Sequence, residues 1–300
     1  MNNNFGPMNG HSIGVIMQEM VRRVISVIRN ERFNFQVSVK TSSNNLPDSV
    51  KTNVDEMAQG IYIQLIRNSF PSYGIVAEES SIKIPYSGVE TDKLYFTVDS
   101  LDGTTAYVRG QSDGIGSMIA LVEETANRET RVISAYVGDV MTQEIYGFHP
   151  GSKNVYRISD NGVVSLLGIN HNLKLCDQEI LLRDNPLELP DHVQRLFTKN
   201  CLFGKIAMSN GSIGMCMAKL WKSEAAAIFL SKTYELPWDN CPVYGISQKM
   251  GFKIFRYSKN QLEAVEPFIG LQVADRDFDI LMVHFSREVE LREWFVSNFN

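Results

Sequence analysis

Apolar residues in the first part of the chain recur at helical spacing. Over residues 12–30 they form one stripe, with arginines on the other side, and this period predicts an amphipathic helix. A second helix is predicted to open at Thr52-Asn53-Val54-Asp55 and to stop at Phe70-Pro71, because the residue before a proline avoids the helical conformation. The polar segment 40–48 is expected to be a loop. The expected core positions of the two helices are Ile13, Ile16, Met17, Met20, Val21, Val24, Ile25, Ile28, Met57, Ile61, Leu65 and Ile66.

Short runs rich in β-branched and aromatic residues follow the second helix and are separated by glycine, proline and asparagine. They predict an antiparallel sheet that the two helices cover. The predicted strands are 75–78, 94–99, 115–122, 131–140 and 143–148, with turns at 110–114, 150–152 and 160–162.

After about residue 168 the pattern changes to shorter strands that alternate with helices, among them 191–199 and 211–230. A closing helix is predicted from about Ser286. No low-complexity linker separates the two parts, so 1–168 and 169–300 are predicted to be tightly packed subdomains of an α+β fold. The closing helix is expected to bury Val289, Leu291, Trp294 and Phe295. The stripe of Met215, Met217, Leu220, Trp221 and Ile228 is expected to be core packing and not a cofactor site.

Composition narrows the class of protein. With 300 residues, 44% of them hydrophobic and 21% charged, the chain is typical of a globular enzyme. Its net charge of -5 offers no excess of positive charge to phosphate backbones, so we do not expect a nucleic-acid partner. The start of the chain lacks the pattern of a signal peptide, and no apolar run reaches the length of a membrane span.

The cysteines, like the missing signal-peptide pattern, favour a cytoplasmic protein. The four cysteines are widely spaced and form no C-x-x-C pair, which favours reduced thiols over a disulfide framework or a zinc site. We therefore expect a cytoplasmic protein without a membrane partner. The cysteines are Cys176, Cys201, Cys216 and Cys241.

The stretch Asp99-Ser100-Leu101-Asp102-Gly103-Thr104-Thr105 carries the most specific chemistry. It follows the apolar run 94–98, so a tight turn there can aim two carboxylates and the Leu101 carbonyl at one hard cation. All-oxygen ligation of this kind suits Mg²⁺. Gly103 permits close approach of the backbone to an anion, and a helix that starts there directs free N–H groups at a phosphate. The same residue types are also typical of any turn with an Asp cap.

Three other acidic elements accompany this stretch. Asp55 lies in the expected first turn of the second helix, where it would also serve as a plain cap. Glu78 and Glu79 end the apolar run 74–77, and Asp239 follows Trp238 at another expected helix start. Their presence favours the metal interpretation of residues 99–105 over a plain turn.

Together these elements resemble the inositol monophosphatase superfamily of Mg²⁺-dependent, lithium-sensitive phosphatases. The family pattern of Thr-x-x-Asp, Gly-Glu-Glu, Asp-Pro-(Ile/Leu)-Asp-Gly-Thr and Trp-Asp occurs here in the same order. The matching residues are Thr52-Asn53-Val54-Asp55, Ala77-Glu78-Glu79, residues 99–104 and Trp238-Asp239.

The resemblance implies a layered αβαβα sandwich, as in inositol monophosphatase and fructose-1,6-bisphosphatase, and two or three Mg²⁺ ions. Residues 1–168 would carry most metal ligands, and 169–300 the last ligand and the substrate pocket. A homodimer would be usual for the family. The implied ligands are Glu78, Asp99, the Leu101 carbonyl, Asp102 and Asp239.

The resemblance also implies how phosphate would be held and attacked. Thr104 would hold the nucleophilic water and pass its proton to Glu78 or Asp55, since a hydroxyl alone is a poor base. The implied phosphate contacts are Asp102 and the amides of Gly103 and Thr104, together with a helix start at Gly211-Ser212-Ile213 that faces the same pocket.

Several positions depart from the family pattern without removing a ligand. Ser100 replaces the proline, Ala77 replaces the first glycine, Ala106 replaces the usual Asn, and Lys249-Met250-Gly251 replaces Ala-Gly-Gly. The chain is therefore interpreted as a divergent member that hydrolyses a small sugar or polyol phosphate monoester by metal-activated water.

Other functions remain open at this point. Fructose-1,6-bisphosphatase and 3'-phosphoadenosine-5'-phosphate phosphatase share the fold, although the latter group usually carries Lys at the position of Thr105. A non-catalytic protein that keeps the site and acts through a partner is the alternative from another class. A Ser-His-Asp hydrolase is disfavoured, because none of the five histidines lies in a motif with a nucleophile, and His171 and His192 are expected at the surface.

The sequence differs most from the family pattern at the residues that would recognise the substrate. The family holds substrate hydroxyls with a Glu seven residues before the Asp of Trp-Asp. Counting back from Asp239 gives Lys232, and a two-residue insertion before Pro237 would give Leu230. Neither side chain accepts a hydrogen bond, although Glu235 could take the place. If Lys232 faces the pocket, its ammonium would favour a second anionic group on the substrate.

Overall fold

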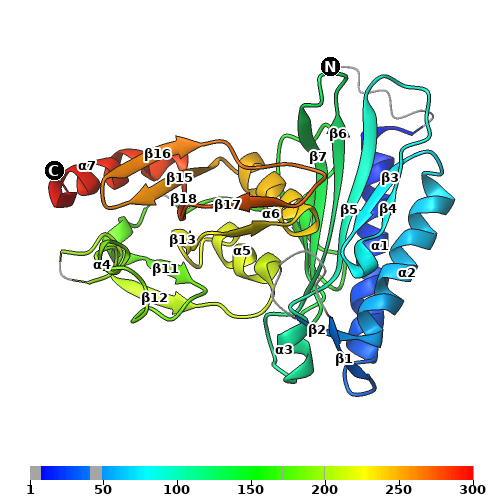
Figure 1. The fold of residues 1–300 in the computed structure, drawn as a ribbon, viewed down its shortest axis with the longest axis horizontal. Coiled ribbons are helices and arrows are strands. Elements are labelled where there is room, and N and C mark those ends of the chain that lie inside the picture. The colour runs from blue at the N-terminus through cyan, green and yellow to red at the C-terminus, as the bar shows by residue number, and fades with distance from the viewer. Residues whose placement is uncertain (1–7, 41–48, 171, 199, 300) are drawn as a thin grey trace.

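The fold is a five-layer sandwich in which helices and sheets alternate (Figure 1). The structure is a computed structural model that describes residues 8–40, 49–170, 172–198 and 200–299. Helices α1 (Gly10–Asn30) and α2 (Asn53–Ser69) form one outer layer, and α5 (Ile213–Trp221) and α6 (Pro237–Lys249) lie between the two large sheets. The far layer holds α4 (Asp191–Gln194) and α7 (Glu288–Phe299). The αβαβα arrangement implied by the resemblance is confirmed.

The first sheet has eight strands in the order β10-β9-β8-β7-β6-β5-β3-β4. It is not wholly antiparallel as predicted, because β3 pairs parallel with β5, with Ala77 beside Val98. Strands that run parallel end at the same edge of a sheet, so Glu78 and Asp99 follow paired residues there. The strands are β3 (Gly74–Ala77), β4 (Lys83–Ile84), β5 (Lys93–Asp102), β6 (Gly116–Glu124), β7 (Thr130–Asp139), β8 (Ile145–Phe148), β9 (Tyr156–Ile158) and β10 (Val164–Leu166).

The second sheet has six strands in the order β12-β11-β13-β18-β15-β16. Its first three strands are parallel and the others antiparallel. They are β11 (Glu179–Leu182), β12 (Lys205–Met208), β13 (Ala227–Leu230), β15 (Phe252–Ser258), β16 (Gln261–Val265) and β18 (Ile280–His284). Two small pairs lie outside these sheets, β1 (Val37–Lys40) with β2 (Ser49–Thr52) and β14 (Thr233–Glu235) with β17 (Ala274–Arg276).

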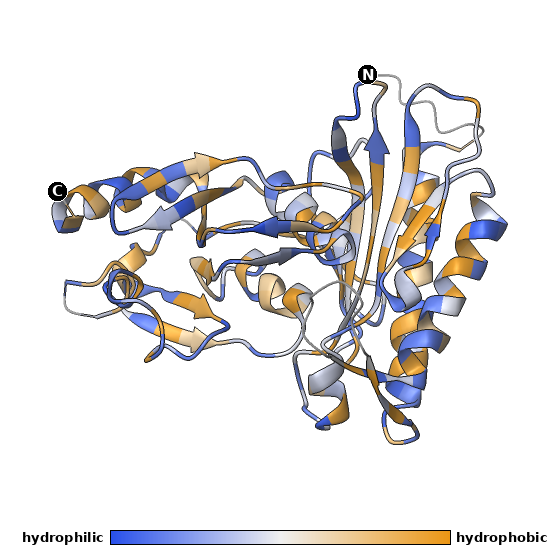
Figure 2. Cartoon of the chain, viewed as in Figure 1, coloured by the Kyte–Doolittle hydropathy of each residue, from blue (hydrophilic) through white to orange (hydrophobic). Residues whose placement is uncertain are grey.

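Three hydrophobic cores fill the spaces between the five layers. The first joins α1 and α2 to one face of the eight-stranded sheet, the second joins its other face to α5, α6 and the six-stranded sheet, and the third lies beneath α4 and α7. Figure 2 shows the outer helices with apolar residues toward the sheet and polar residues on the other side. The apolar stripe of α1 accordingly forms part of the first core, as its spacing predicts.

Some expected elements have different bounds or burial. The helix predicted over 211–230 ends at Trp221, where Ser223 adopts a positive φ of 59°, and Ile228 belongs to β13. A residue in this left-handed conformation commonly ends a helix. The predicted core role of the Met215-to-Ile228 stripe is confirmed, because all five side chains are buried.

Two predicted core residues are exposed, Met57 by 42% and Val289 by 67%. In α2 the buried face is set by Val54, Ala58, Tyr62 and Ile66, so Met57 lies off that stripe. In α7, by contrast, Leu291 and Phe295 are buried as predicted, and Trp294 is half-buried.

The remaining predictions concern ends and loops. The helix expected at 191–199 is only Asp191–Gln194, and Lys199 and His171 lie outside the described residues, as do 41–48. Lys40, expected in that loop, ends β1. His192 lies at the surface and is half-buried. In the described part of the chain, no helix combines the length and apolarity that crossing a bilayer requires.

Candidate active site

The acidic stretch lies at the end of β5, and a bulge determines how its two aspartates are placed. Residues three apart in a regular strand face opposite sides of a sheet. Against β6, Asp99 pairs with Met118 and Asp102 with Gly116, so one extra residue is inserted between them. A bulge of this kind re-aims side chains. The strand therefore continues three residues beyond the predicted end at Asp99, and both carboxylates remain close enough to influence each other.

Position 103 requires glycine, both for its backbone conformation and for the space around it. It has a φ of +92°, which side-chain-bearing residues rarely adopt. A Cβ at this position would lie 2.3 Å from the Gly114 carbonyl oxygen and 2.7 Å from the Ser212 nitrogen. The glycine thus lets the end of β5 touch the loop before β6 and the start of α5. The short helix α3 (Thr104–Val108) begins directly after it, as predicted.

Thr104 and Asp55 form the hydrogen bond that a proton relay requires. The Thr104 hydroxyl oxygen lies 2.8 Å from Asp55 Oδ1 and 3.1 Å from the Leu101 carbonyl. Asp55 also accepts from the Thr52 nitrogen at 2.8 Å and from the Thr52 hydroxyl at 2.6 Å, which completes a capping box on α2. Asp55 therefore caps α2 and contacts Thr104 at the same time. Burial raises its pKa, and the hydrogen bonds from Thr52 and Thr104 oppose that shift.

Asp99 and Asp239 interact directly, although 140 positions separate them in the sequence. Asp239 lies in the first turn of α6, and its carboxyl group hydrogen-bonds that of Asp99. Burial raises the pKa of both groups well above the usual range, and the charges of Glu78 and Asp102 raise it further. Ionisation of both carboxyl groups is therefore unfavourable without a compensating cation.

Asp102 is bound to the start of α5. Its oxygens accept from the Ser212 hydroxyl, from the Ile213 nitrogen at 3.1 Å and from the Gly214 nitrogen at 2.7 Å. Burial nevertheless raises its pKa, because desolvation outweighs these bonds and the nearby charge of Arg183. The amide groups that the resemblance assigned to phosphate at this helix start are therefore occupied by Asp102. A carboxylate at a helix N-terminus is itself a favourable arrangement.

The residues fit a divalent metal, although they are not gathered around one point. Their donors are carboxylate and carbonyl oxygens, and a cation would offset the raised pKa of the Asp99 and Asp239 carboxyl groups. Within the described ranges, however, no three His, Cys, Asp or Glu side chains are arranged to hold an ion.

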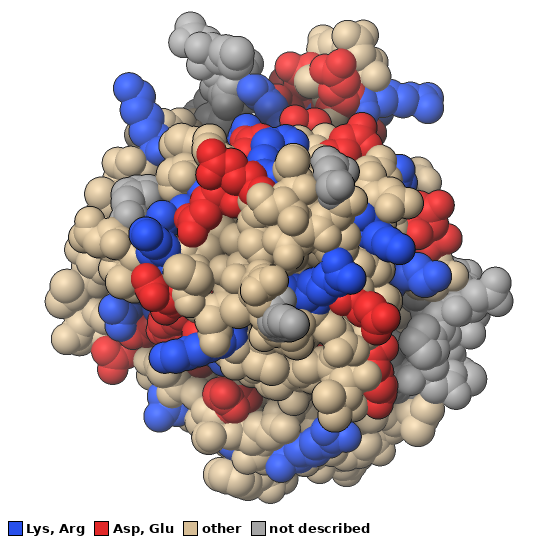
Figure 3. All heavy atoms as spheres, turned by 90° about the vertical axis from the view of Figure 1, so that its left-hand side faces the viewer, with Lys and Arg blue, Asp and Glu red and all other residues tan. Residues whose placement is uncertain are grey.

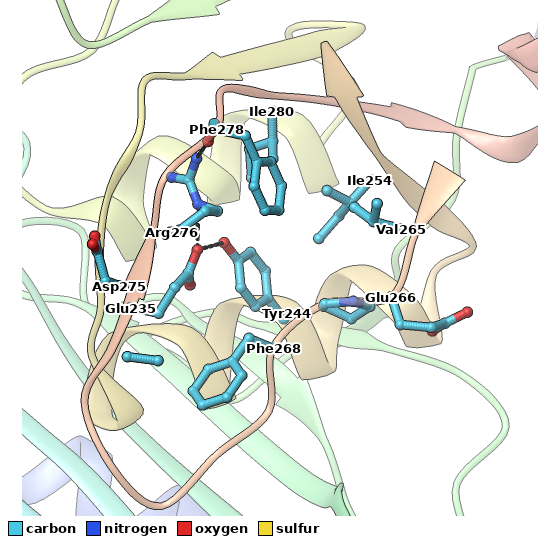
Figure 4. A pocket seen from close by; sticks show the side chains of 12 residues that line it. Glu235, Tyr244, Ile254, Val265, Glu266, Phe268, Asp275, Arg276, Phe278 and Ile280 are labelled. Atoms are coloured by element: carbon cyan, nitrogen blue, oxygen red, sulfur yellow. Dashed lines mark hydrogen bonds and ion pairs between the residues drawn. The ribbon is translucent and has the colours of Figure 1, made fainter. Parts of the chain in front are cut away.

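A pocket of about 300 Å³ adjoins Asp239, and all three candidate substrate residues line it: Leu230, Lys232 and Glu235. Glu235 is only 3% exposed and pairs with Arg276, while its oxygens also accept from Asn240 and Tyr244. Figure 4 shows the contacts of Glu235 with Arg276 and Tyr244 from the neighbouring pocket. Because Glu235 is held in this way, it does not replace the family glutamate as a free acceptor. The side chain of Lys232 is exposed.

Two residues near the site were missed by sequence reasoning. The Gln59 side chain bonds the Glu79 nitrogen at 2.8 Å and the Glu79 carbonyl at 2.9 Å, which fixes the turn directly after Glu78. A glutamine on the buried face of α2, one turn after Asp55, was the available signal. Arg183 follows β11 and lines the pocket beside Asp239. In the sequence, Arg183 could have been found as a charged residue at the end of an apolar run.

Comparison with known proteins agrees with this geometry. The sequence model of the inositol monophosphatase family matches residues 11–279. The chain belongs to that family. Staphylococcal inositol monophosphatase-1 is 19% identical over 96% of each chain, with a TM-score of 0.69. An IMPase/NADP phosphatase complexed with NADP and Ca²⁺ is 18% identical, with a TM-score of 0.69 over 96% of this chain and 97% of that one. At such identities the likeness shows the fold.

Curated relatives match over shorter stretches. The Nus factor SuhB of Xylella fastidiosa is 35% identical over 72 residues, which is 24% of each chain. The Nus factor SuhB of Vibrio cholerae is 30% identical over 101 residues, which is 34% of each chain. The chain thus matches about a quarter to a third of the length of these relatives.

The first prediction concerns Asp99→Asn in the metal-free protein. The variant mimics the protonated carboxyl, since its amide can accept from the Leu101 nitrogen and donate to Asp239. A raised native pKa means that wild-type stability falls as pH rises above about 4, where the unfolded Asp ionises. In chelator at pH 8 we expect the variant to be more stable by about 1 to 3 kcal/mol.

Thermal unfolding at pH 5 and pH 8 measures this difference. Added Mg²⁺ should stabilise the wild type more at pH 8 than at pH 5, and should stabilise Asp99→Asn little at either pH. Asp92→Asn, at an exposed position before β5, is the matched control. Equal stability of Asp99→Asn and the wild type at pH 8 in chelator would contradict the raised pKa of Asp99.

Proposed function

We propose that this protein is a Mg²⁺-dependent phosphatase that hydrolyses a small phosphate monoester, of the sugar or polyol phosphate type. The Thr104–Asp55 hydrogen bond beside a cluster of carboxylates is the observation that supports this most. Bound Mg²⁺ supplies positive charge to the phosphoryl oxygens and lowers the pKa of a bound water. The residues that would hold the metal are Glu78, Asp99, the Leu101 carbonyl, Asp102 and Asp239.

Thr104 and Asp55 handle the proton of the attacking water. The Thr104 hydroxyl donates to Asp55 Oδ1 and so presents its lone pairs to a water molecule, whose proton it passes on to the carboxylate. The raised pKa of buried Asp55 makes it a better acceptor than an ordinary Asp. Glu78, which follows β3 at the same sheet edge, is the other proton acceptor consistent with the resemblance.

Phosphate would be held by the amides of Gly103 and Thr104 and by the start of α5. In the structure Asp102 occupies the Ile213 and Gly214 nitrogens. Asp102 is also one of the residues that would hold the metal, and these two N–H groups would serve an anion only where Asp102 does not accept from them.

The expected partner is a small phosphorylated metabolite, met in the cytoplasm by a homodimer of the chain. Neither nucleic acid nor a membrane is proposed as a partner. Figure 3 supports this for one face, the end of the molecule where α4 and α7 lie, because basic and acidic side chains are interspersed across it. Such a surface lacks the single-sign field that polyanions require.

A non-catalytic role is the second candidate, and it has one observation in its favour. The curated relatives that match a quarter to a third of their length carry the name Nus factor SuhB. A non-catalytic protein would keep the carboxylate site while acting through a partner. The phosphatase is preferred, because Thr104, Asp55 and each carboxylate of the family pattern are present in this chain.

The second prediction tests the reaction itself. In a screen of phosphate monoesters, phosphate release should require Mg²⁺ and should be suppressed by Li⁺, as the family resemblance implies. The screen is run with Mg²⁺, with Mg²⁺ plus Li⁺, and with excess chelator. Full activity in chelator would exclude the metal mechanism, and the absence of turnover on every ester would favour the non-catalytic role.

The third prediction concerns Thr104→Ala. Loss of the hydroxyl breaks the proton relay but leaves the Gly103 and Thr104 amides in place, so kcat should fall by about 100-fold or more while KM changes by less than about threefold. Thr104→Ser keeps a hydroxyl and is the matched control, which should retain most activity. Steady-state kinetics on any ester found in the screen measures both. A change confined to KM would contradict the relay.

The fourth prediction concerns substrate choice. Without the family glutamate, inositol 1-phosphate should be a poorer substrate than a sugar bisphosphate, since a missing acceptor costs about 1 to 3 kcal/mol. Lys232→Glu should raise kcat/KM for inositol 1-phosphate by about tenfold and lower it for the bisphosphate. Lys259→Glu, exposed in the turn between β15 and β16, controls for the charge change. Inositol 1-phosphate as the best wild-type substrate would refute this specificity.

A further inference from the structure

Gln59 holds the backbone of Glu79 at two points. Its Oε1 accepts from the Glu79 nitrogen at 2.8 Å, and its Nε2 donates to the Glu79 carbonyl at 2.9 Å. Both residues are buried, with exposed fractions of 3% for Gln59 and 2% for Glu79. An amide side chain that bonds a residue in this way occupies both of its backbone groups, as a neighbouring strand would. One side chain of α2 therefore fixes the backbone of residue 79.

The turn that begins at Glu79 needs such support. Ser80 and Ser81 have positive φ values of 58° and 47°, a left-handed conformation that is unfavourable for residues with a side chain. A strained turn persists only where its surroundings hold it. Besides the Gln59 contacts, the Glu79 carboxylate pairs with Lys51 of β2 at 3.3 Å. Residue 79 is thus held by its nitrogen, its carbonyl and its side chain.

Glu78 is the residue that this arrangement places. Its carbonyl accepts from the Ser81 nitrogen at 3.0 Å, which joins it to the strained turn. Its negative charge raises the pKa of Asp99 and Asp239, so its side chain lies near both. Because Glu78 and Glu79 share a peptide bond, a shift of the Glu79 backbone also moves the Glu78 carboxylate relative to the acidic cluster.

The same face of α2 carries Asp55. Gln59 lies four residues after Asp55, so the two side chains leave the helix on one face. Asp55 accepts from the Thr104 hydroxyl, whereas Gln59 reaches the turn after Glu78. One helix face thus carries Asp55 and supports the turn that follows Glu78, and these are the two proton acceptors of the proposed reaction.

We propose that Gln59 is a positioning residue, which holds Glu78 in the orientation for metal binding by fixing the backbone of Glu79. This inference rests on the metal site of the proposed function, and Gln59 itself takes no part in the reaction. Residues that orient a metal ligand from behind commonly change metal affinity by about 10- to 100-fold when they are replaced. The competing role is purely structural, in which Gln59 only satisfies the buried backbone groups of the turn.

A double-mutant cycle on Mg²⁺ binding separates the two roles. Gln59→Met keeps the length of the side chain and removes both hydrogen bonds, and Glu78→Gln removes the charge of the ligand. Each metal-free protein is titrated with Mg²⁺ alone, and the dissociation constant is taken from the rise of the unfolding temperature, which also detects weak binding. Gln59→Met should weaken Mg²⁺ binding by about tenfold or more in the wild-type background and by less than about twofold in the Glu78→Gln background.

Ser134→Ala is the matched control, because it removes a buried hydrogen bond that Ser134 of β7 donates to the Phe148 carbonyl. Ser134 pairs with Leu121, away from the end of β6 at Gly116 that adjoins the site. This variant should lower the unfolding temperature without changing the Mg²⁺ dissociation constant. Gln59→Asn keeps an amide but is too short to reach both backbone groups, so it replaces Gln59→Met in the cycle if that variant fails to fold.

Three results would overturn the proposal. An unchanged Mg²⁺ dissociation constant in the Gln59 variant would leave only the structural role. Weakening by the same factor in both backgrounds would show that Gln59 does not act through Glu78, and the absence of Mg²⁺ binding by the wild type would leave no ligand to position.

The cycle measures binding without substrate, so its outcome is separate from that of the proposed function. If the chain releases no phosphate from any ester, the phosphatase proposal fails. A loss of Mg²⁺ affinity that depends on Glu78 would still establish the role of Gln59 in that case. Conversely, Mg²⁺-dependent turnover together with additive effects in the cycle would leave the phosphatase in place and exclude this role.

Discussion

The constraint on which this structure depends is the burial of several carboxyl groups in one place. Like charges in a poorly hydrated site cannot all ionise, so each must keep a proton, find hydrogen-bond donors or bind a cation. Asp99 and Asp239 hydrogen-bond each other and have pKa values raised by burial, and Asp102 accepts hydrogen bonds from the start of α5. Such a cluster lowers the stability of the fold. Proteins commonly keep a destabilising arrangement of this kind where it serves function.

The layers of the fold converge on that cluster. Parallel pairing of β3 with β5 places Glu78 and Asp99 at one edge of the eight-stranded sheet. The outer helix α2 brings Asp55 to Thr104 from one side, and the middle helix α6 brings Asp239 to Asp99 from the other. Gly103 allows the closest contact, between the end of β5 and the start of α5. The acidic site is thus assembled from three layers, and each layer is held by its own hydrophobic core.

Much of the fold and of the acidic site could be predicted from the sequence, because these features follow from local patterns of residues. The stripe of α1, the cap of α2 and the turn at Gly103 follow from spacing and residue type, and the motif order correctly indicated the family. The parallel pairing of β3, the bulge after Asp99 and the early end of α5 depend on tertiary contacts and could not be read locally. The engagement of Asp102 with α5 joins residues 110 positions apart.

Substrate recognition shows the same limit most clearly. The sequence left Leu230, Lys232 and Glu235 as alternatives, since two alignments place Lys232 or Leu230 at the position of the family glutamate and Glu235 could take that place. The segment before Pro237 forms β14 (Thr233–Glu235), which pairs with β17 and brings Arg276 to Glu235. That partner lies 41 residues downstream, so no local pattern could show that Glu235 is already engaged. Arg183 was overlooked for a similar reason, because only the folded chain places it beside Asp239 and Lys232.

Proton release on Mg²⁺ binding tests the central claim, that the cluster holds protons in place of metal, most directly. Calorimetric titration of the metal-free protein with Mg²⁺ near pH 6.5, repeated in buffers of different ionisation enthalpy, counts the protons released. The account predicts net proton release, since cation binding lowers the raised pKa of the Asp99 and Asp239 carboxyl groups. Mg²⁺ binding without any proton release, or no Mg²⁺ binding at all, would contradict it.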